Sequence, residues 1–361
     1  MIPLAVVGMS YREGPNRLRA RLLELDQDDK GPSRELVGTS AANGVVRLHT
    51  CSRVEWVISS PNPAWAAQLL RSALLSRAGE DAKGRDLHLK SGVAAAHYLT
   101  RVTLGLDAVA EGEAAVGRQV VKAFEVARKD GTTDRALHAA WRALSHTLHR
   151  RRDELPGGEG VGVQTLVVQA LKARKLARGE KVVVFGRGEM GKAAQRALER
   201  AGYAVTSYSR DGRAKFERAA KTAPAVVVAS GAPYAWLELP ERTGKPVVVD
   251  VGSPPQLKAT PGWVAITLDD LLDEGHAGVS DEELARLSAL CDEEARRLCE
   301  ELEKPPPAEA LEAIDDARKE FLREQLPGLL EGLKPEDQKR LKASMARFAH
   351  TVLKRTRGAA P

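Results

Sequence analysis

The stretch "KVVVFGRGEMGKAAQRAL", Lys181 to Leu198, decides the fold of the middle of this chain. A wholly apolar run precedes Gly186, Gly188 and Gly191, which have the spacing GxGxxG, and an amphipathic helical pattern follows. Gly186 permits a tight turn, Gly188 lets the backbone approach a pyrophosphate, and Gly191 allows close packing of helix on strand. Strand, turn and helix in this order predict a Rossmann-type dinucleotide-binding domain.

The end of the next predicted strand indicates which dinucleotide to expect. The strand Ala204 to Ser207 is followed by Tyr208, Ser209 and Arg210, so no acidic residue is placed to bind the 2′-hydroxyl of NAD. Ser209 and Arg210 instead offer hydrogen-bond donors and positive charge to a 2′-phosphate. The alternative is that Arg210 is an exposed turn arginine. We expect NADPH, bound by the strand end and by the turn residues: Gly186, Gly188, Glu189, Met190, Gly191, Ser209 and Arg210.

The chain changes character twice, which predicts an α/β protein of three domains. Residues 1–154 alternate short strand-like runs, such as Leu4 to Gly8, with helical patterns, as an α+β domain does. A cluster of structure-breaking residues then precedes the dinucleotide-binding domain, residues 155–280, whose apolar strands alternate with helices. Residues 281–361 are predicted to be helical, with leucines at 284, 287, 290, 298 and 302. No sheet is predicted to cover this leucine stripe, so a second copy of the chain is the simplest cover.

Composition places the chain among globular proteins. It has 361 residues, of which 43% are hydrophobic and 29% charged, so it can bury ordinary cores. No apolar run is long enough to cross a bilayer and the N-terminus lacks the pattern of a signal peptide, so we expect a cytoplasmic protein without a membrane partner. The net charge of +6 fits a polyanionic partner and is also common in soluble enzymes. The three cysteines, Cys51, Cys291 and Cys299, are too scattered to predict a disulfide framework or a metal site.

The segment "VVRLHTCSRVEWV", Val45 to Val57, carries a cysteine within a strand-like run. A period of two puts His49, Cys51, Arg53 and Glu55 on one face, among groups able to lower the pKa of the thiol or to bind a polar substrate. The alternative is that Cys51 is a small buried hydrophobe and that Arg53 and Glu55 form an ordinary ion pair. A thiol nucleophile beside an NADPH domain suggests attack on an acyl ester, followed by hydride reduction of the thioester to an aldehyde.

Segments along nearly the whole chain, taken in order, resemble motifs of the glutamyl-tRNA reductase family. They are "GMSYREGPNRLR", "HTCSRVE", "RVTLGLDAVAEGEAAVGRQVVKAF", "HRRRDEL", "FGRGEMG", "VVVDVGSPPQL" and "TLDDL". The resemblance implies a catalytic domain, an NADPH domain and a helical dimerisation domain joined by one long spinal helix. It also implies conversion of glutamyl-tRNA(Glu) to glutamate-1-semialdehyde, the first step of the five-carbon route to tetrapyrroles. A homodimer and a glutamate-1-semialdehyde aminomutase partner are expected on the same basis.

Carried over by position, the resemblance makes Cys51 the nucleophile and His97 a second catalytic candidate. It makes a further set substrate-binding candidates: Thr50, Arg53, Glu55, Asp107, Glu113 and Gln119. The histidine that the family places in this helix falls at Tyr98, next to His97. Since one residue turns a helical side chain by about 100°, His97 is equally well interpreted as a surface or packing histidine.

Several polar positions of the family pattern are changed in this chain: Tyr11, Ser52, Leu104, Ala108 and Ala115. Two hypotheses therefore stay open. The first is an active NADPH-dependent reductase of glutamyl-tRNA with a modified pocket. The second is a non-catalytic or diverged homologue that binds tRNA, haem or a pathway partner. The retained thiol and glycine motif favour the enzyme, because a pure binding protein needs no thiol beside a hydride site.

Overall fold

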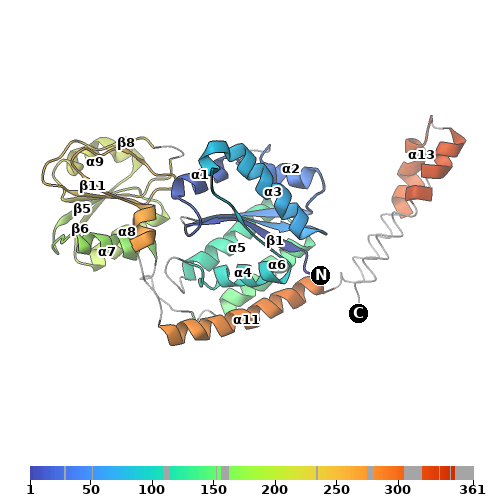
Figure 1. Cartoon of the computed structure of the whole chain (residues 1–361), viewed down its shortest axis with the longest axis horizontal. Helices are drawn as coiled ribbons and strands as arrows, with labels where there is room; N and C mark the ends of the chain where they lie inside the picture. The colour runs from blue at the N-terminus through green and yellow to red at the C-terminus, as the bar shows by residue number, and fades with distance from the viewer. Residues whose placement is uncertain are drawn as a thin grey trace. The chain divides into compact units, whose positions relative to one another are not determined.

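The computed structural model divides the chain into two compact units, Met1–Cys299 and Glu300–Pro361 (Figure 1). The first unit contains two separate main sheets, one in each of the first two predicted domains. The domain boundaries near residues 154 and 280 stay predictions. The structure describes residues 1–27, 30–50, 52–108, 114–151, 153–155, 162–232, 235–274, 280–304, 319–332, 334–341 and 343–345.

The first sheet is antiparallel, with the strand order β2-β3-β1-β4. Its strands are β1 (Leu4–Ser10), β2 (Gly44–His49), β3 (Arg53–Ser59) and β4 (His88–Ser91). Helices cover both faces, so every residue of β1 and β3 is buried (Figure 1). One face packs against α1 (Asn16–Glu24), α2 (Pro32–Gly38) and α3 (Pro63–Ala78), which the 3-10 turn η1 (Gly79–Ala82) follows. The other face lies against α4 (Val93–Thr103), α5 (Ala114–Lys129) and α6 (Arg135–Arg150).

The second sheet is wholly parallel, as the apolar strands alternating with helices predict. Its strand order is β11-β9-β7-β5-β6. Its strands are β5 (Lys181–Phe185), β6 (Ala204–Tyr208), β7 (Ala225–Val228), β9 (Val247–Asp250) and β11 (Val264–Thr267). One face is covered by α7 (Val163–Ala173), α8 (Glu189–Arg200) and α10 (Leu268–Glu274), the other by α9 (Arg213–Ala220). The turn η2 (Arg210–Gly212) precedes α9, and β8 (Leu237–Glu238) pairs with β10 (Leu257–Ala259) beside the sheet.

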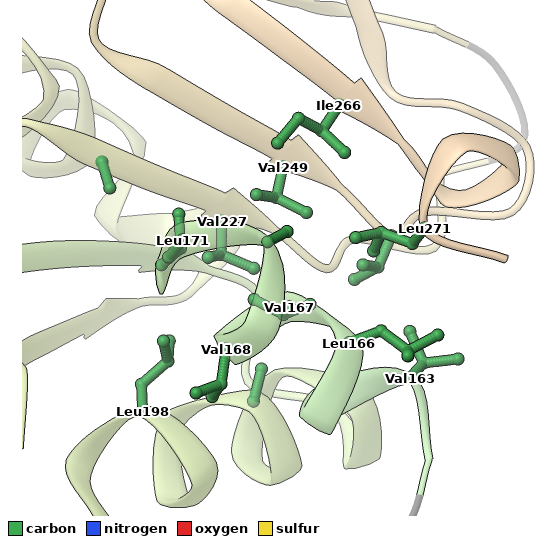
Figure 2. Close-up of a cluster of buried hydrophobic side chains, with 14 of the residues drawn as sticks. Val163, Leu166, Val167, Val168, Leu171, Leu198, Val227, Val249, Ile266 and Leu271 are labelled. Atoms are coloured by element: carbon green, nitrogen blue, oxygen red, sulfur yellow. The ribbon is translucent and has the colours of Figure 1, made fainter. Parts of the chain in front are cut away.

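The core on the α7 face holds this parallel sheet to its helices (Figure 2). Val167 and Leu171 of α7 lie against Val227 and Val249, which come from neighbouring strands. Full burial of each such aliphatic side chain contributes about 1.5–3 kcal/mol relative to its exposed state. The strand β5, which ends before the glycine turn, contributes Val182 and Val184 to this core.

The helix α11 (Asp281–Glu303) packs along the first unit through leucines. Leu284, Leu287 and Leu290 join a cluster that contains Leu104 and Leu155. A second copy of the chain was predicted as the simplest cover for this stripe, but the chain itself buries Leu287 and partly buries Leu284 and Leu290. The pattern identified an amphipathic helix correctly but did not indicate which surface it packs against.

A buried carboxylate fastens α11 to α6. Glu294 accepts hydrogen bonds from Thr147 Oγ1 (2.7 Å), Arg150 Nη2 (2.5 Å) and Arg151 Nε (3.0 Å). Burial alone would raise the pKa of Glu294, but these donors lower it below its usual value. Two of the three arginines of the "HRRRDEL" segment, Arg150 and Arg151, are therefore engaged within the chain.

The second unit is described in part. Its described elements are the π-helical turn η3 (Phe321–Gln325), α13 (Leu326–Leu329) and a helical stretch at 335–341. Across the described residues of both units, the structure contains no helix with the length and apolarity needed to span a lipid bilayer.

Candidate active site

The segment around Cys51 is a hairpin turn, because β2 ends at His49 and β3 begins at Arg53. Thr50 N donates to Arg53 O (3.0 Å), and Ser52 N donates to Thr50 Oγ1 (3.2 Å). Tyr11 N donates to Ser52 O (2.7 Å), which ties the turn to the end of β1. Cys51 itself lies outside the described residues, but both of its neighbours are held by hydrogen bonds.

The hairpin corrects the expectation that His49 shares a face with Arg53 and Glu55. His49 pairs with Val54, and directly paired residues of antiparallel strands project to the same face. Val54 belongs to the core under α1 and α3, whereas Arg53 and Glu55 project to the opposite face. The prediction treated His49 to Glu55 as one continuous strand, but a turn separates β2 from β3, so the alternation of side chains in β3 does not continue that of β2.

Arg53 and Glu55 form a buried ion pair, with side chains only 1% and 0% exposed and Nη1 2.9 Å from Oε1. The hydroxyl of Tyr98 donates to Glu55 Oε1 (2.5 Å) and accepts from Arg53 Nη1 (3.0 Å). Arg53 Nη2 also donates to the backbone oxygen of Asp107. Burial alone would lower the pKa of Arg53, but the charge of Glu55 and the nearby Tyr98 and Asp107 raise it, so the guanidinium stays charged. Burial and Glu55 also raise the pKa of Tyr98, so its hydroxyl remains a donor.

Two residues that the sequence patterns did not single out, His88 and Glu13, extend this cluster across β1. Gly8 pairs with Glu55 on one side and with His88 on the other. His88 Nε2 lies 3.6 Å from Glu55 Oε1, and His88 Nδ1 lies 3.2 Å from Glu13 Oε1. A glycine inside the apolar strand β1 was the one available signal, because strand glycines often mark a close approach of neighbouring groups.

Asp107 lies at the border of this cluster, in the turn after α4. Its carboxylate is 3.3 Å from Arg101 Nε and 3.8 Å from Arg12 Nη1. Gln119 lies on α5 and, among the described residues, makes no hydrogen bond to the cluster. Glu113 lies outside the described residues. The structure thus gathers the side chains of Arg53 and Glu55 with the Asp107 backbone and leaves Gln119 apart.

His97 and Tyr98 point to different places. His97 Nε2 lies 2.9 Å from Asp292 Oδ1 and 4.0 Å from Cys291 Sγ, both on α11. Tyr98 faces Glu55 and Arg53. His97 therefore stands outside the cluster, and its contacts match the packing interpretation and give no support to a catalytic one.

The glycine turn after β5 has a shape that fits a pyrophosphate. A Cβ on Gly186, whose φ is 122°, would collide with the backbone of Ala229, and one on Gly191 would collide with the backbone of Gly186. Gly188, by contrast, has no other group within 4 Å of where its Cβ would be. It precedes the first turn of α8, whose backbone N–H groups have no side-chain cap. Open space beside free helix donors suits an anionic ligand.

The other predicted cofactor residues surround this turn. Gly186 N donates to Tyr208 O (2.9 Å), which places Ser209 and the exposed Arg210 next to the turn. Glu189 lies 3.9 Å from Lys122 Nζ of α5, and Met190 packs on the core beneath α8. Arg187 Nη2 donates to Ser207 O (3.0 Å), so the sequence missed a second guanidinium at this edge. Its position inside the glycine motif was the signal.

Contacts between α1 and the parallel-sheet region join three of the segments quoted above. Asn16 Nδ2 donates to Gly252 O (2.7 Å), and Ser253 Oγ donates to Asn16 Oδ1 (2.7 Å). Asp269 accepts from Asn16 N (2.8 Å) and pairs with Arg19 Nη2 (3.2 Å). Asn16 and Arg19 are each only 1% exposed, so these contacts are part of the interior.

Comparison with known proteins supports the resemblance. Residues 7–155 match the family model described as "Glutamyl-tRNAGlu reductase, N-terminal domain". The chain is similar to the glutamyl-tRNA reductases. It is 34% identical over 194 residues to the glutamyl-tRNA reductase of Thermus thermophilus, covering 52% of this chain and 46% of that one. It therefore spans about half the length of this and similar curated relatives.

Two further comparisons extend over more of the chain. The glutamyl-tRNA reductase 2 of an Anaeromyxobacter species is 28% identical over 357 residues, covering 88% of this chain and 82% of that protein. The solved glutamyl-tRNA reductase from Methanopyrus kandleri has a TM-score of 0.47 and 24% identity, covering 98% of this chain and 94% of that chain.

Several changed positions of the glutamyl-tRNA reductase pattern acquire a structural explanation. Leu104 and Ala108 are both 0% exposed, and Leu104 packs against Leu287 of α11. Ser52 and Tyr11 join through their backbones, so that contact does not depend on their side chains. Ala115 is half-buried in the first turn of α5. Packing thus accommodates Leu104 and Ala108, and a backbone hydrogen bond joins Tyr11 and Ser52.

Proposed function

We propose that this chain reduces glutamyl-tRNA(Glu) to glutamate-1-semialdehyde with NADPH, through a thioester on Cys51. The single observation that carries the proposal is the buried Arg53 guanidinium, held by Glu55 and Tyr98 directly after the turn that contains Cys51. Arg53 Nε has no hydrogen-bond partner among the described residues, so donor capacity remains for a substrate carboxylate.

The chemistry assigned to Cys51 is acyl transfer followed by reduction. Its thiolate attacks the ester carbonyl, a C–S bond forms, the C–O bond to the tRNA ribose breaks, and the ribose oxygen takes up a proton. Arg53 holds the glutamate carboxylate during this step. Bound NADPH supplies the hydride that converts the thioester to the aldehyde, which restores the thiolate.

Two features support NADPH: the glycine turn after β5, and the neighbouring strand end beside which Arg187 and Arg210 lie. Gly188 has open space at the start of α8 for a pyrophosphate, and Gly186 and Gly191 allow the close backbone packing of the turn. Arg210 is exposed and Arg187 lies at the same strand end, so two guanidinium groups are available to a 2′-phosphate. No acidic residue occupies the position that would bind a free 2′-hydroxyl.

Trapping of the thioester tests the proposal directly. Protein is incubated with radiolabelled glutamyl-tRNA(Glu) without NADPH, and we expect label on the protein that hydroxylamine releases. Cys51→Ser abolishes both the label and aldehyde formation. Cys291→Ser is the matched control, because burial raises the pKa of the Cys291 thiol to about 12 and leaves it unreactive.

A non-catalytic homologue that binds tRNA, haem or a pathway partner is the second candidate. The apolar, fully buried Leu104 and Ala108 favour it, because the family pattern has polar residues there. Wild-type protein that binds glutamyl-tRNA but acquires no label would establish this candidate and contradict the enzyme.

The assembly is proposed from the family resemblance alone. We expect a cytoplasmic homodimer formed through residues after about 300, and an interaction with glutamate-1-semialdehyde aminomutase. Sedimentation of the full chain at micromolar concentration tests the first expectation, and a monomer would contradict it.

A further inference from the structure

We propose that His88 is a positioning residue that, together with Glu13, holds the Glu55 carboxylate and through it the substrate-binding Arg53. The inference rests on the proposed function, since it assigns Arg53 to the substrate carboxylate. It concerns His88 on β4, which lies outside the segments that carry the family resemblance, and Glu13 in the segment after β1, which lies within one of them but was not a candidate site residue.

Gly8 makes the contact between His88 and Glu55 possible. Glu55, Gly8 and His88 lie side by side on neighbouring strands β3, β1 and β4, with their side chains on one face. A Cβ on Gly8 would come within 2.7 Å of Glu55 Cγ and closer still to the β3 backbone. Because Gly8 has none, two residues that lie two strands apart approach to 3.6 Å.

Glu13 orients the imidazole from its other side. Burial alone would raise the pKa of Glu13, but hydrogen bonds from His88 and Ser10 lower it to about 2. Glu13 is therefore an anion at neutral pH and can only accept, which makes His88 Nδ1 the donor. The ring of Tyr98 meets the imidazole edge to face at 5.2 Å between centroids, and Lys90 Nζ lies 5.1 Å from that ring. The orientation of His88 is thus determined by several elements.

Two atoms at the centre of the arrangement have no hydrogen-bond partner among the described residues. They are His88 Nε2 and Glu55 Oε2, and both are buried. His88 Nε2 is too far from Glu55 Oε1 for a hydrogen bond, at 3.6 Å, yet within ion-pair distance. Hydrogen bonds at catalytic sites are often long without substrate and shorten when it binds. We infer that this contact shortens when Arg53 takes up its carboxylate.

The kinetic consequence follows from the indirect role. A residue that holds Arg53 equally in the bound ground state and in the transition state changes KM and not kcat. His88→Ala should therefore raise the KM for glutamyl-tRNA about tenfold, with kcat and the KM for NADPH changed less than about twofold. His88→Gln should keep part of the affinity, because its amide can still donate toward Glu55.

The matched control is His138→Gln. His138 also makes a side-chain hydrogen bond, to Thr133 Oγ1 (2.8 Å), but it lies on α6 outside the cluster. It should leave both KM values unchanged. A loss in kcat without a change in KM at His88→Ala, or equal effects of His88→Gln and His138→Gln, would overturn the positioning role.

A second measurement does not depend on enzymatic activity. Imidazole ¹⁵N chemical shifts of the full-length chain, assigned with His88→Gln, should show a proton on Nε2, which donates toward Glu55, as well as on Nδ1, which donates to Glu13, and Glu13→Ala should abolish this doubly protonated form. A proton on only one of the two nitrogens in the wild type would overturn the inference. If wild-type protein forms no aldehyde but both nitrogens carry a proton, the proposed function fails while the arrangement of His88 stands.

Discussion

The cofactor turn and the Arg53 cluster use glycine for opposite purposes. At Gly186 and Gly191 the missing side chains let backbone pack on backbone, Gly186 against Ala229 after the neighbouring strand β7 and Gly191 against Gly186. At Gly8 the missing side chain lets Glu55 and His88, from two different strands, come together above β1. The first site is made by backbone, and the second by side chains from β3, β4, α4 and the segment after β1. The two sites should therefore respond differently to substitution.

The largest expected effect is at Arg53. Arg53→Ala leaves Glu55 buried without its cation, which should lower the free energy of unfolding by about 3–5 kcal/mol. Urea denaturation measures this change in the free energy of unfolding. The control Lys83→Ala removes an exposed pair with Glu80 and should cost less than about 0.5 kcal/mol. Equal losses in the two variants would contradict the view that the cluster depends on its buried side chains.

Alanine substitutions at Gly191 and Gly188, compared with each other, test the cofactor turn that the backbone forms. Gly191→Ala places a Cβ against the backbone of Gly186, and such overpacking should lower the stability by about 1–3 kcal/mol. Gly188→Ala meets no group within 4 Å, so its stability should change by less than about 0.5 kcal/mol while NADPH binding weakens. Thermal unfolding measures the change in stability of each variant, and cofactor titration measures the change in its affinity for NADPH. Normal NADPH affinity in Gly188→Ala would show that the pyrophosphate lies elsewhere.

Arg210 tests whether side chains at the strand edge add specificity to the backbone turn. Arg210→Ala removes one charge-assisted contact and should raise the KM for NADPH about tenfold, with the use of NADH nearly unchanged. Steady-state kinetics with NADPH and with NADH measure the two KM values. An equal effect on both cofactors would argue against a 2′-phosphate at this edge.

The smallest expected effect is the pH response of Glu13. Its pKa is about 2 in the folded chain against an ordinary value of 4.5, so the stabilisation is present above about pH 4.5 and is lost as the pH falls toward 2. Glu13→Gln should flatten this part of the stability curve, by about 1 kcal/mol after allowance for its partly exposed side chain. Urea unfolding between pH 5 and 2.5 measures the slope. An unchanged slope would mean that His88 does not stabilise the Glu13 anion.

The sequence by itself predicted the features that depend on neighbouring residues. The apolar run before Gly186 and the helix pattern after it predicted a parallel strand, a turn and α8, because that unit is built from local backbone geometry. The apolar run Leu4 to Gly8 likewise predicted β1. Arg53 and Glu55 share a face, as the alternation predicted, and they form the ion pair that was the alternative interpretation of this segment.

Only the tertiary structure decided how distant segments meet. His49 was placed on the wrong face because the alternation was counted through a turn, and Leu287 was left for a second subunit because the sequence does not say which surface covers a helix. The choice of Tyr98 over His97, and the inclusion of His88 and Glu13, depend on strand register and on the position of α4. Such contacts join residues tens of positions apart, and no local periodicity encodes them.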